Sequence, residues 1–181
     1  LQLVEEAEPK LEGSEMVPWL DRLATEHGNL RAGVEWAVDR DPEAALRLVS
    51  GLTFFWQRRG FLTEGRRMIS ASLARVDALP PVDGDARPAR MALRAKALWC
   101  GGTNAFGQGE LDVSRAMLDE AVVLAREYGT PKTLVDALTM LGFACVLLGD
   151  EAASEAAIEE GERVASATKY KQGIAALKGV R

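Results

Sequence analysis

A repeat of about 40 residues constrains the fold of this chain more than any other feature of its 181 residues. When the sequence is shifted by that length, small, acidic and apolar residues fall on one another: Gly102 on Gly142, Gly109-Glu110 on Gly149-Asp150, Glu120 on Glu160, and Leu134 on Ile174. The pattern over 88–128 thus recurs over 131–168, and a third copy begins at 170. Residues 42–76 resemble these copies more loosely. Such a repeat indicates an array of similar units, each burying its apolar face against the next.

Apolar residues have helical spacing along nearly the whole chain, and no segment alternates with period two for long enough to predict a strand. Asp41-Pro42, Thr130-Pro131 and Asp150 are typical helix starts, and Gly60 is a typical helix stop, so one helix is predicted from Pro42 to about Arg59. One continuous apolar stripe predicts a helix over about 20–38, made of Leu20, Leu23, His27, Leu30, Val34 and Val38. Short breaks between helices of similar length predict antiparallel neighbours. We therefore predict an all-α fold of antiparallel helical hairpins stacked as an α–α superhelix.

One loop interrupts this pattern, at DALPPVDGDARP, where proline, glycine and aspartate cannot sustain a helix. We predict a single domain over 1–181, with atypical hairpins in 1–76, the loop in 77–87, and repeat hairpins in 88–181, the last one truncated. Both ends fall inside helical patterns, so we expect a fragment of a larger protein. An open terminal hairpin would expose an apolar face, and self-association is therefore expected.

The composition is ordinary for a globular domain, with 48% apolar and 27% charged residues and a net charge of −5. No overall basicity recruits nucleic acid or anionic lipid. No apolar run approaches the length of a membrane span, and no signal peptide opens the chain. Cys100 and Cys145 form no CxxC pair, so we expect two reduced thiols in the core and a cytoplasmic location.

Candidate catalytic residues are few. His27 is the only histidine, without a second histidine for a metal site or a G-x-S-x-G turn for a nucleophile. The glycine-rich stretch 101–110 lacks the preceding strand and the following Lys-Ser/Thr of a phosphate loop, so close helix packing explains it better. Trp36 and Trp56 are predicted to be buried. We therefore expect no catalytic residue, no metal, no cofactor and no enzymatic activity.

Charge is unevenly distributed, because residues 58–96 hold nine Lys and Arg against four acidic residues. One interpretation is a solvated face that pairs with acidic neighbours. The alternative is a helical surface that contacts nucleic acid or phosphate through this basic segment. No aromatic residues interleave with the basic ones to stack on bases, and nucleic acid is not the expected partner.

Two stretches, WLDRLATEHGNLRAGVEWAV and DPEAALRLVSGLTFFWQRRGFLTEGRRMISASLA, resemble a segment of large bacterial signalling ATPases. These are the LuxR-type, MalT-like and SARP-type regulators, in which the segment opens a tetratricopeptide-like helical array. The most diagnostic residues are Glu26 to Ala32, Phe55 to Gly60, and Glu64 to Arg67. Residues 88–181 are similar to tetratricopeptide hairpins in general, although the proline that closes such repeats is replaced by Arg126 and Ser166.

This resemblance implies a non-catalytic domain for protein interaction or effector sensing, within a multidomain transcriptional or signalling regulator whose ATPase or cyclase domain lies elsewhere. It implies a protein or peptide partner, a small effector, or other domains of the same protein. In the family the first helix of each hairpin lines a concave wall. Carried over by position, this predicts a binding groove lined by Lys96, Trp99, Thr103, Asp136, Thr139 and Phe143.

Overall fold

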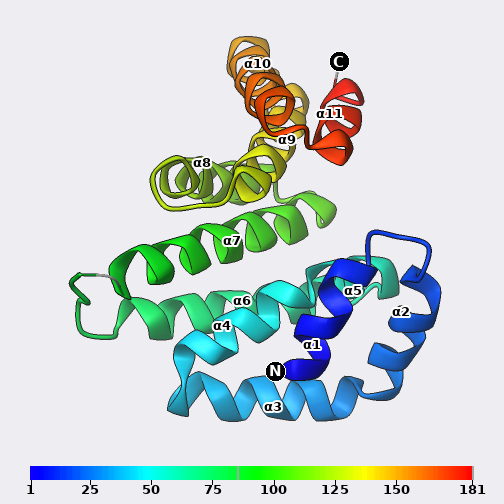
Figure 1. Ribbon diagram of the computed structural model, residues 1–181, viewed down its shortest axis with the longest axis vertical. Coiled ribbons are helices and arrows are strands. Elements are labelled where there is room, and N and C mark those ends of the chain that lie inside the picture. Colours follow the sequence, from blue (N-terminus) through cyan, green and yellow to red (C-terminus); the bar gives the residue numbers. More distant parts are fainter. Residues whose placement is uncertain (85, 181) are drawn as a thin grey trace. The chain divides into compact units, whose positions relative to one another are not determined.

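The computed structural model describes residues 1–84 and 86–180, and all regular secondary structure in these residues is helical. The prediction of an all-α fold built from helical hairpins is confirmed. The chain divides into two compact units, Leu1–Pro81 and Val82–Arg181 (Figure 1). We call them the N-terminal and C-terminal units. The division falls inside the predicted loop at 77–87, and the prediction of a single domain over 1–181 stays a prediction.

The N-terminal unit consists of six α-helices and a short 3-10 helix at Glu8–Lys10. Two breaks differ from the prediction, because the apolar stripe over 20–38 and the helix from Pro42 to Arg59 are each divided in two. The α-helices are α1 (Gln2–Ala7), α2 (Met16–Thr25), α3 (His27–Arg40), α4 (Pro42–Gly51), α5 (Thr53–Arg59) and α6 (Leu62–Asp77).

Tertiary packing accounts for both breaks. At Glu26 the backbone leaves helical geometry, with φ −90° and ψ 2°, and the His27 ring that follows stacks on Phe61 with centroids 4.3 Å apart. At Gly51, the Cβ of any other residue would lie 2.5 Å from Val4 Cγ1 of α1. Helix α1 therefore packs directly on the end of α4, and the chain turns at Leu52 before α5 begins.

The four tryptophans do not share one environment. Trp56 on α5 is 1% exposed, which confirms its predicted place in the core. Trp36 is 58% exposed, so its predicted burial is wrong. The core of α3 is formed by Leu30, Val34 and Ala37, and Trp36 lies off that stripe, where the Arg40 guanidinium stacks over its ring. The apolar character of Trp36 alone does not reveal this, because the angular position of a residue on the helix decides whether it is buried.

The C-terminal unit is a series of antiparallel helix pairs. Its helices are α7 (Ala86–Gly107), α8 (Leu111–Glu127), α9 (Pro131–Leu147), α10 (Glu151–Thr168) and α11 (Lys171–Lys178). Each packs on its neighbour in sequence, and α9 also packs on α7 and on α11 (Figure 1). The predicted caps are confirmed: Thr130 Oγ1 accepts from Thr133 N at 3.2 Å, and Asp150 Oδ1 accepts from Ala153 N at 3.1 Å.

The two repeat glycines differ in how tightly they are packed. A Cβ at Gly102 would lie 2.7 Å from Leu118 Cγ, so α7 and α8 approach closely there, whereas a Cβ at Gly142 would lie 3.2 Å from Val180 Cγ1 and at an ordinary contact distance of 3.4 Å from Ile158 Cγ1. Gly109 and Gly149 end the first helix of each hairpin with φ near +75°, a conformation that favours glycine. Cys100 and Cys145 are buried free thiols, as predicted.

Among the described residues, no helix combines the length and the apolar character needed to cross a lipid bilayer.

Candidate functional site

The six predicted groove residues lie on the first helices of two successive hairpins, with Lys96, Trp99 and Thr103 on α7 and Asp136, Thr139 and Phe143 on α9. We call this set the α7–α9 wall. Helices α7 and α9 contact each other directly, so the structure does bring the two halves of the wall together. Its members differ strongly in exposure: Trp99 is 8% and Thr139 is 5% exposed, whereas the other four are partly exposed.

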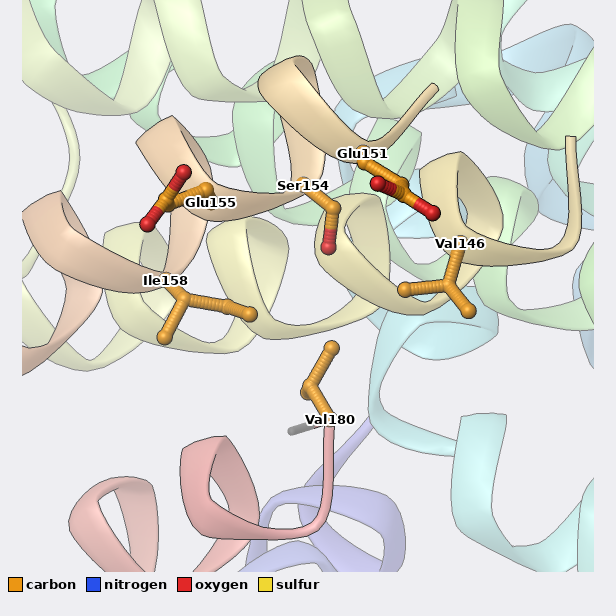
Figure 2. A pocket seen from close by; sticks show the side chains of 6 residues that line it. All are labelled: Val146, Glu151, Ser154, Glu155, Ile158 and Val180. Carbon is orange, nitrogen blue, oxygen red and sulfur yellow. The ribbon is translucent and has the colours of Figure 1, made fainter. Parts of the chain in front are cut away.

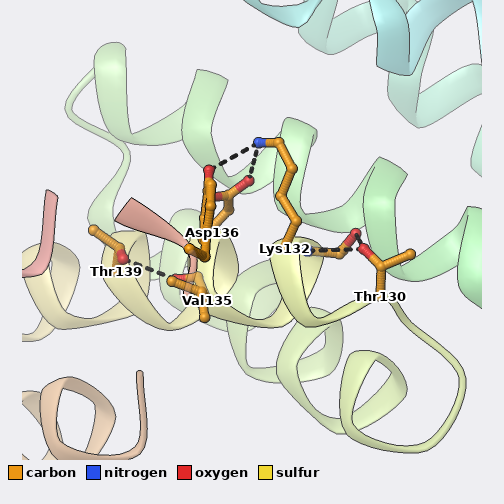
Figure 3. Close-up of polar contacts among 7 residues, drawn as sticks. Thr130, Lys132, Val135, Asp136 and Thr139 are labelled. Carbon is orange, nitrogen blue, oxygen red and sulfur yellow. Dashed lines mark hydrogen bonds and ion pairs between the residues drawn. The ribbon is translucent and has the colours of Figure 1, made fainter. Parts of the chain in front are cut away.

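The two threonines of the wall use their hydroxyl groups within their own helices. Thr103 Oγ1 donates to the Trp99 carbonyl at 2.8 Å, and Thr139 Oγ1 donates to the Val135 carbonyl at 2.7 Å (Figure 3). A ligand would therefore find these oxygens available only as acceptors.

Two residues outside the prediction complete the site. Lys132 Nζ on α9 donates to Asp136 Oδ2 at 2.7 Å (Figure 3). It also donates to the Tyr170 hydroxyl at 3.1 Å. The Tyr170 hydroxyl donates to Asp136 Oδ1 at 3.0 Å. We call Lys132, Asp136 and Tyr170 the polar cluster. All three pairs are in contact, so the cluster is a closed triangle of one cation, one anion and one phenol.

The polar cluster is bounded by aromatic rings. Lys132 Nζ lies 5.9 Å from the centroid of the Trp99 ring and 5.3 Å from that of Tyr170, so the ammonium group faces two π systems as well as a carboxylate. Further along the same helices, the rings of Phe106 and Phe143 lie 6.3 Å apart. The wall thus has a polar end at the start of α9 and an aromatic end toward its close.

Burial has a measurable consequence for the cluster. It raises the pKa of the Tyr170 hydroxyl above its ordinary value, and the adjacent Asp136 carboxylate raises this pKa further. Lys132 opposes both effects by stabilising the phenolate. The phenol therefore stays protonated at neutral pH and remains a hydrogen-bond donor to Asp136.

Sequence signals for the two missed residues were unequal. Lys132 precedes Asp136 by four residues, the spacing at which oppositely charged side chains meet on a helix. Tyr170 has no such signal, because it reaches Asp136 only after α11 folds back against α9. It occupies the position just before α11 that Thr130 occupies before α9.

His27 lies in the N-terminal unit, where its ring packs against two phenylalanine rings. Its ring stacks on Phe61, meets the edge of Phe55 at 5.7 Å, and its Nε2 lies 3.2 Å from Glu64 Oε2. The last contact is within ion-pair distance but does not have hydrogen-bond geometry. The three stretches that carry the family resemblance therefore contact one another here, since His27, Phe55 and Glu64 each belong to a different one.

Four of the nine basic residues at 58–96 pair with acidic residues of the chain. Three of its arginines pair across helices: Arg59 with Asp21, Arg75 with Asp39, and Arg94 with Glu120 at 2.7 Å. Arg67 lies 3.8 Å from Glu35. These pairs fit the interpretation of a solvated face better than that of a phosphate-binding surface. No group of three or more potential ligand side chains is placed to hold a metal ion in the part of the chain that the structure describes.

Comparison with known proteins adds little to this geometry. No protein-family model matches the chain, and no curated protein matches it. Among solved structures, the chain is similar to BtubC (BKLC) from P. vanneervenii, with a TM-score of 0.36 and 16% sequence identity over 93% of this chain and 89% of that chain. A similarity this weak carries no argument about function.

Proposed function

We propose that the chain is a non-catalytic recognition domain that binds a protein or peptide segment on the α7–α9 wall of the C-terminal unit. The observation that supports this most is the polar cluster, in which Lys132, Asp136 and Tyr170 meet beside Trp99. Side chains from three successive first helices, α7, α9 and the start of α11, converge there. Polar groups that converge beside aromatic rings are typical of sites that recognise a ligand by shape and hydrogen bonding.

The balance of charge within the cluster favours a polypeptide over an anion. Lys132 is matched by Asp136, so no net positive charge is left to attract a phosphate or a carboxylate. A backbone amide or carbonyl group of a peptide can hydrogen bond to such a neutral network, while its apolar side chains contact Phe106 and Phe143. A small effector with the same combination of polar and aromatic groups is the second class of ligand.

We further propose that this domain belongs to a multidomain bacterial transcriptional or signalling regulator that works in the cytoplasm. The support is the resemblance at Glu26 to Ala32, Phe55 to Gly60, and Glu64 to Arg67. In such a protein the helical domain would pass ligand binding to an effector domain by a rigid-body shift of hairpins. The presence of a P-loop ATPase in the same gene product would support this proposal, and its absence would contradict it.

A displayed peptide library tests the recognition site directly. Peptides selected on the wild-type chain are compared for binding to the Asp136→Asn and Tyr170→Phe variants, which keep the shape of each side chain but remove a charge or a donor. We expect about tenfold weaker binding to both variants, the effect of losing a buried hydrogen bond to a charged group. Lys171→Gln, a charge change on the exposed start of α11, serves as the matched control.

Selected peptides that bind all four proteins equally would contradict the assignment of the site. The alternative function, contact with nucleic acid or phosphate through residues 58–96, is separated by a salt titration of DNA binding. Phosphate contacts give a steep loss of affinity with rising salt, whereas peptide binding at the charge-balanced cluster is expected to change little.

A further inference from the structure

Side chains from three different elements surround the ammonium group of Lys132. Trp99 comes from α7, Asp136 from α9, and Tyr170 from the residue before α11. Lys132 Nζ lies 2.7 Å from Asp136 Oδ2 (Figure 3). The same atom stands over the Trp99 and Tyr170 rings, 5.9 Å and 5.3 Å from their centroids. A carboxylate and aromatic faces are groups that hold an ammonium or guanidinium ion in proteins. We call the position of Lys132 Nζ the cation site.

The aromatic walls of the cation site are fixed by packing. Trp99 is 8% exposed, so its ring lies almost wholly within the protein. The Tyr170 ring packs where a larger residue at position 173 would not fit, because a Cβ at Gly173 would lie 2.5 Å from Tyr170 Cδ1 and 2.6 Å from Val135 Cγ1. Both rings are therefore preorganised, which favours binding because little conformational freedom is lost.

Lys132 differs from these walls because much of its side chain is exposed, 47% against 15% for Asp136. The two residues are one helical turn apart on α9, and ion pairs at this spacing hold exposed side chains only weakly. The lysine stem also rotates about several bonds. Lys132 can therefore leave the cation site while the rings and the carboxylate stay in place.

The arrangement around the cation site is not copied by the repeat. Forty residues earlier in the sequence, the three positions of the polar cluster carry Ala92, Lys96 and Thr130. These residues include neither a carboxylate nor an aromatic ring. The packing of one hairpin on the next therefore does not require the polar cluster, and this favours a role for it in recognition.

The surroundings of the cation site select a positively charged group. The Asp136 carboxylate and the negative faces of both rings repel a carboxylate or a phosphate. A neutral side chain would take the place of Lys132 without its charge, and a carboxylate that loses its cation in a partly buried position is destabilised. A lysine or arginine side chain meets both requirements.

We propose that the cation site receives a lysine or arginine side chain of the bound peptide, and that Lys132 fills the site until the peptide displaces it. This inference rests on the proposed function, because it names the residue type that the α7–α9 wall recognises. One cation replaces another beside Asp136, so the charge balance of the polar cluster is kept. Lys132 is an internal competitor, and it lowers the affinity for the peptide according to the fraction of time for which it fills the site.

A groove elsewhere in the same unit provides an internal comparison. It has a volume of about 370 Å³ and is lined by Val146, Ile158, Val180, Ser154, Glu151 and Glu155 (Figure 2). The groove offers two carboxylates, but its described lining residues include no aromatic ring, and it shares no residue with the cation site. A cation attracted by carboxylates alone would bind there as well. The groove therefore separates simple charge attraction from recognition by the rings.

Methylguanidinium is the probe for the cation site, and methylurea is its neutral counterpart of similar shape. Each is titrated at neutral pH into the complete 181-residue chain, and NMR follows the indole N–H resonance of Trp99, one of four tryptophans, which Trp99→Phe assigns. The wild type is compared with Lys132→Ala and with the control Lys171→Ala, which removes an exposed lysine beside Tyr170. Lys132→Ala is also combined with Asp136→Asn and, as a control, with Glu155→Gln.

We expect Lys132→Ala to bind methylguanidinium about tenfold more tightly than the wild type, the factor that follows if Lys132 fills the site for about nine-tenths of the time. Adding Asp136→Asn should remove this gain, whereas adding Glu155→Gln should preserve it. Lys171→Ala should bind as the wild type does, and methylurea should bind to none of the proteins. Thermal unfolding of each variant checks that the fold is intact.

Equal affinity of the wild type and Lys132→Ala for methylguanidinium would overturn the proposal. So would equal binding of methylurea and methylguanidinium, or a gain that survives Asp136→Asn. Loss of the gain on adding Glu155→Gln would assign the binding to the groove and would overturn the proposal as well.

Peptides selected from the displayed library supply a second measurement. Replacing one lysine or arginine of such a peptide by glutamine should weaken its binding about tenfold, as expected for a lost hydrogen bond between charged groups. Lys132→Ala should strengthen binding of the unaltered peptide. Peptides that lose affinity for Asp136→Asn but tolerate replacement of every basic residue would overturn this inference and leave the proposed function standing. Peptides that are insensitive to Asp136→Asn would overturn both.

Discussion

At the scale of single residues, the absence of a side chain decides how closely helices of the N-terminal unit approach. Gly65 on α6 faces the buried Trp56 ring, and a Cβ there would lie 2.5 Å from Trp56 Cδ2. Gly33 on α3 is also helical, but a Cβ at that position would meet no heavy atom within 4 Å. The two glycines therefore differ in purpose, since only Gly65 is required for the indole to fit.

Substituting each of these glycines with alanine should give opposite results. We expect Gly65→Ala to destabilise the chain by about 1–3 kcal/mol, because the new methyl group collides with a ring that cannot move within a packed core. Gly33→Ala should stabilise it by about 0.5–1 kcal/mol, because alanine loses less backbone freedom on folding into a helix. Urea unfolding measures both, and destabilisation of equal size at the two positions would contradict the packing described here.

The raised pKa of Tyr170 gives a second prediction at this scale. In a Tyr128→Phe variant, phenolate absorbance reports on Tyr170 alone, and we expect it to titrate above the ordinary tyrosine value of about 10. Because the pKa is raised in the folded state, the associated stability is fully present below the unfolded pKa and is lost as pH rises through the folded one. Asp136→Asn should lower the pKa of Tyr170, and a rise would count against the polar cluster.

At the scale of elements, a side-chain cap fixes where three of the helices begin, namely α4, α9 and α10. Asp41 Oδ1 accepts a hydrogen bond from Ala44 N at 3.0 Å, and Pro42 occupies the first helical position of α4. The same type of contact starts α9 at Thr130 and α10 at Asp150. These bonds satisfy backbone donors that the helix itself cannot pair.

Removing the cap of α4 should have a modest and specific cost. We expect Asp41→Ala to lower the free energy of unfolding by about 1 kcal/mol, and Asp41→Asn to retain most of it, since asparagine caps helices nearly as well. Thermal unfolding monitored by circular dichroism compares the two variants. If asparagine proves as damaging as alanine, a role of Asp41 other than capping would be required.

Local signals explain why helix boundaries in the C-terminal unit could be predicted while two in the N-terminal unit could not. Thr130-Pro131 and Gly149-Asp150 carry cap and stop residues whose conformations are set within a few residues. The breaks at Glu26 and Leu52 carry no such residues, and they arise from contacts with Phe61 and α1 that are distant in sequence. Helical periodicity continues across both positions and conceals them.

The same contrast between local signals and contacts distant in sequence applies to the residues of the candidate site. The resemblance to tetratricopeptide-like arrays implies that Trp99 and Asp136 lie on one wall, and the structure has them on α7 and α9, which contact each other. The partnership of Lys132 and Tyr170 with Asp136 could not be predicted, because it requires the path of α11. The exposure of individual wall residues could not be predicted from the sequence either: Trp99, for example, is buried.

At the scale of the whole molecule, the division into two compact units should determine where a protease first cleaves the chain. Residues 78–84 connect the units without a helix and are largely exposed, whereas the breaks at 108–110 and 148–150 are tight turns between packed helices. Brief thermolysin digestion should therefore cut first at Val82. Mass spectrometry identifies the fragments, and an initial cut in either tight turn would contradict a division at this loop.

Arg115 on α8 pairs with Asp150 at 2.7 Å, whereas the position forty residues later, on α10, carries Glu155, and this reversal of charge limits how the array could be extended by one repeat. An extra copy of 111–150 would contain both Arg115 and Asp150, so the arginine of the added repeat could again pair with an aspartate. An extra copy of 131–170 would instead bring a duplicated Asp150 against Glu155, placing two carboxylates in one seam. An added repeat is thus electrostatically favourable when it spans 111–150 and unfavourable when it spans 131–170.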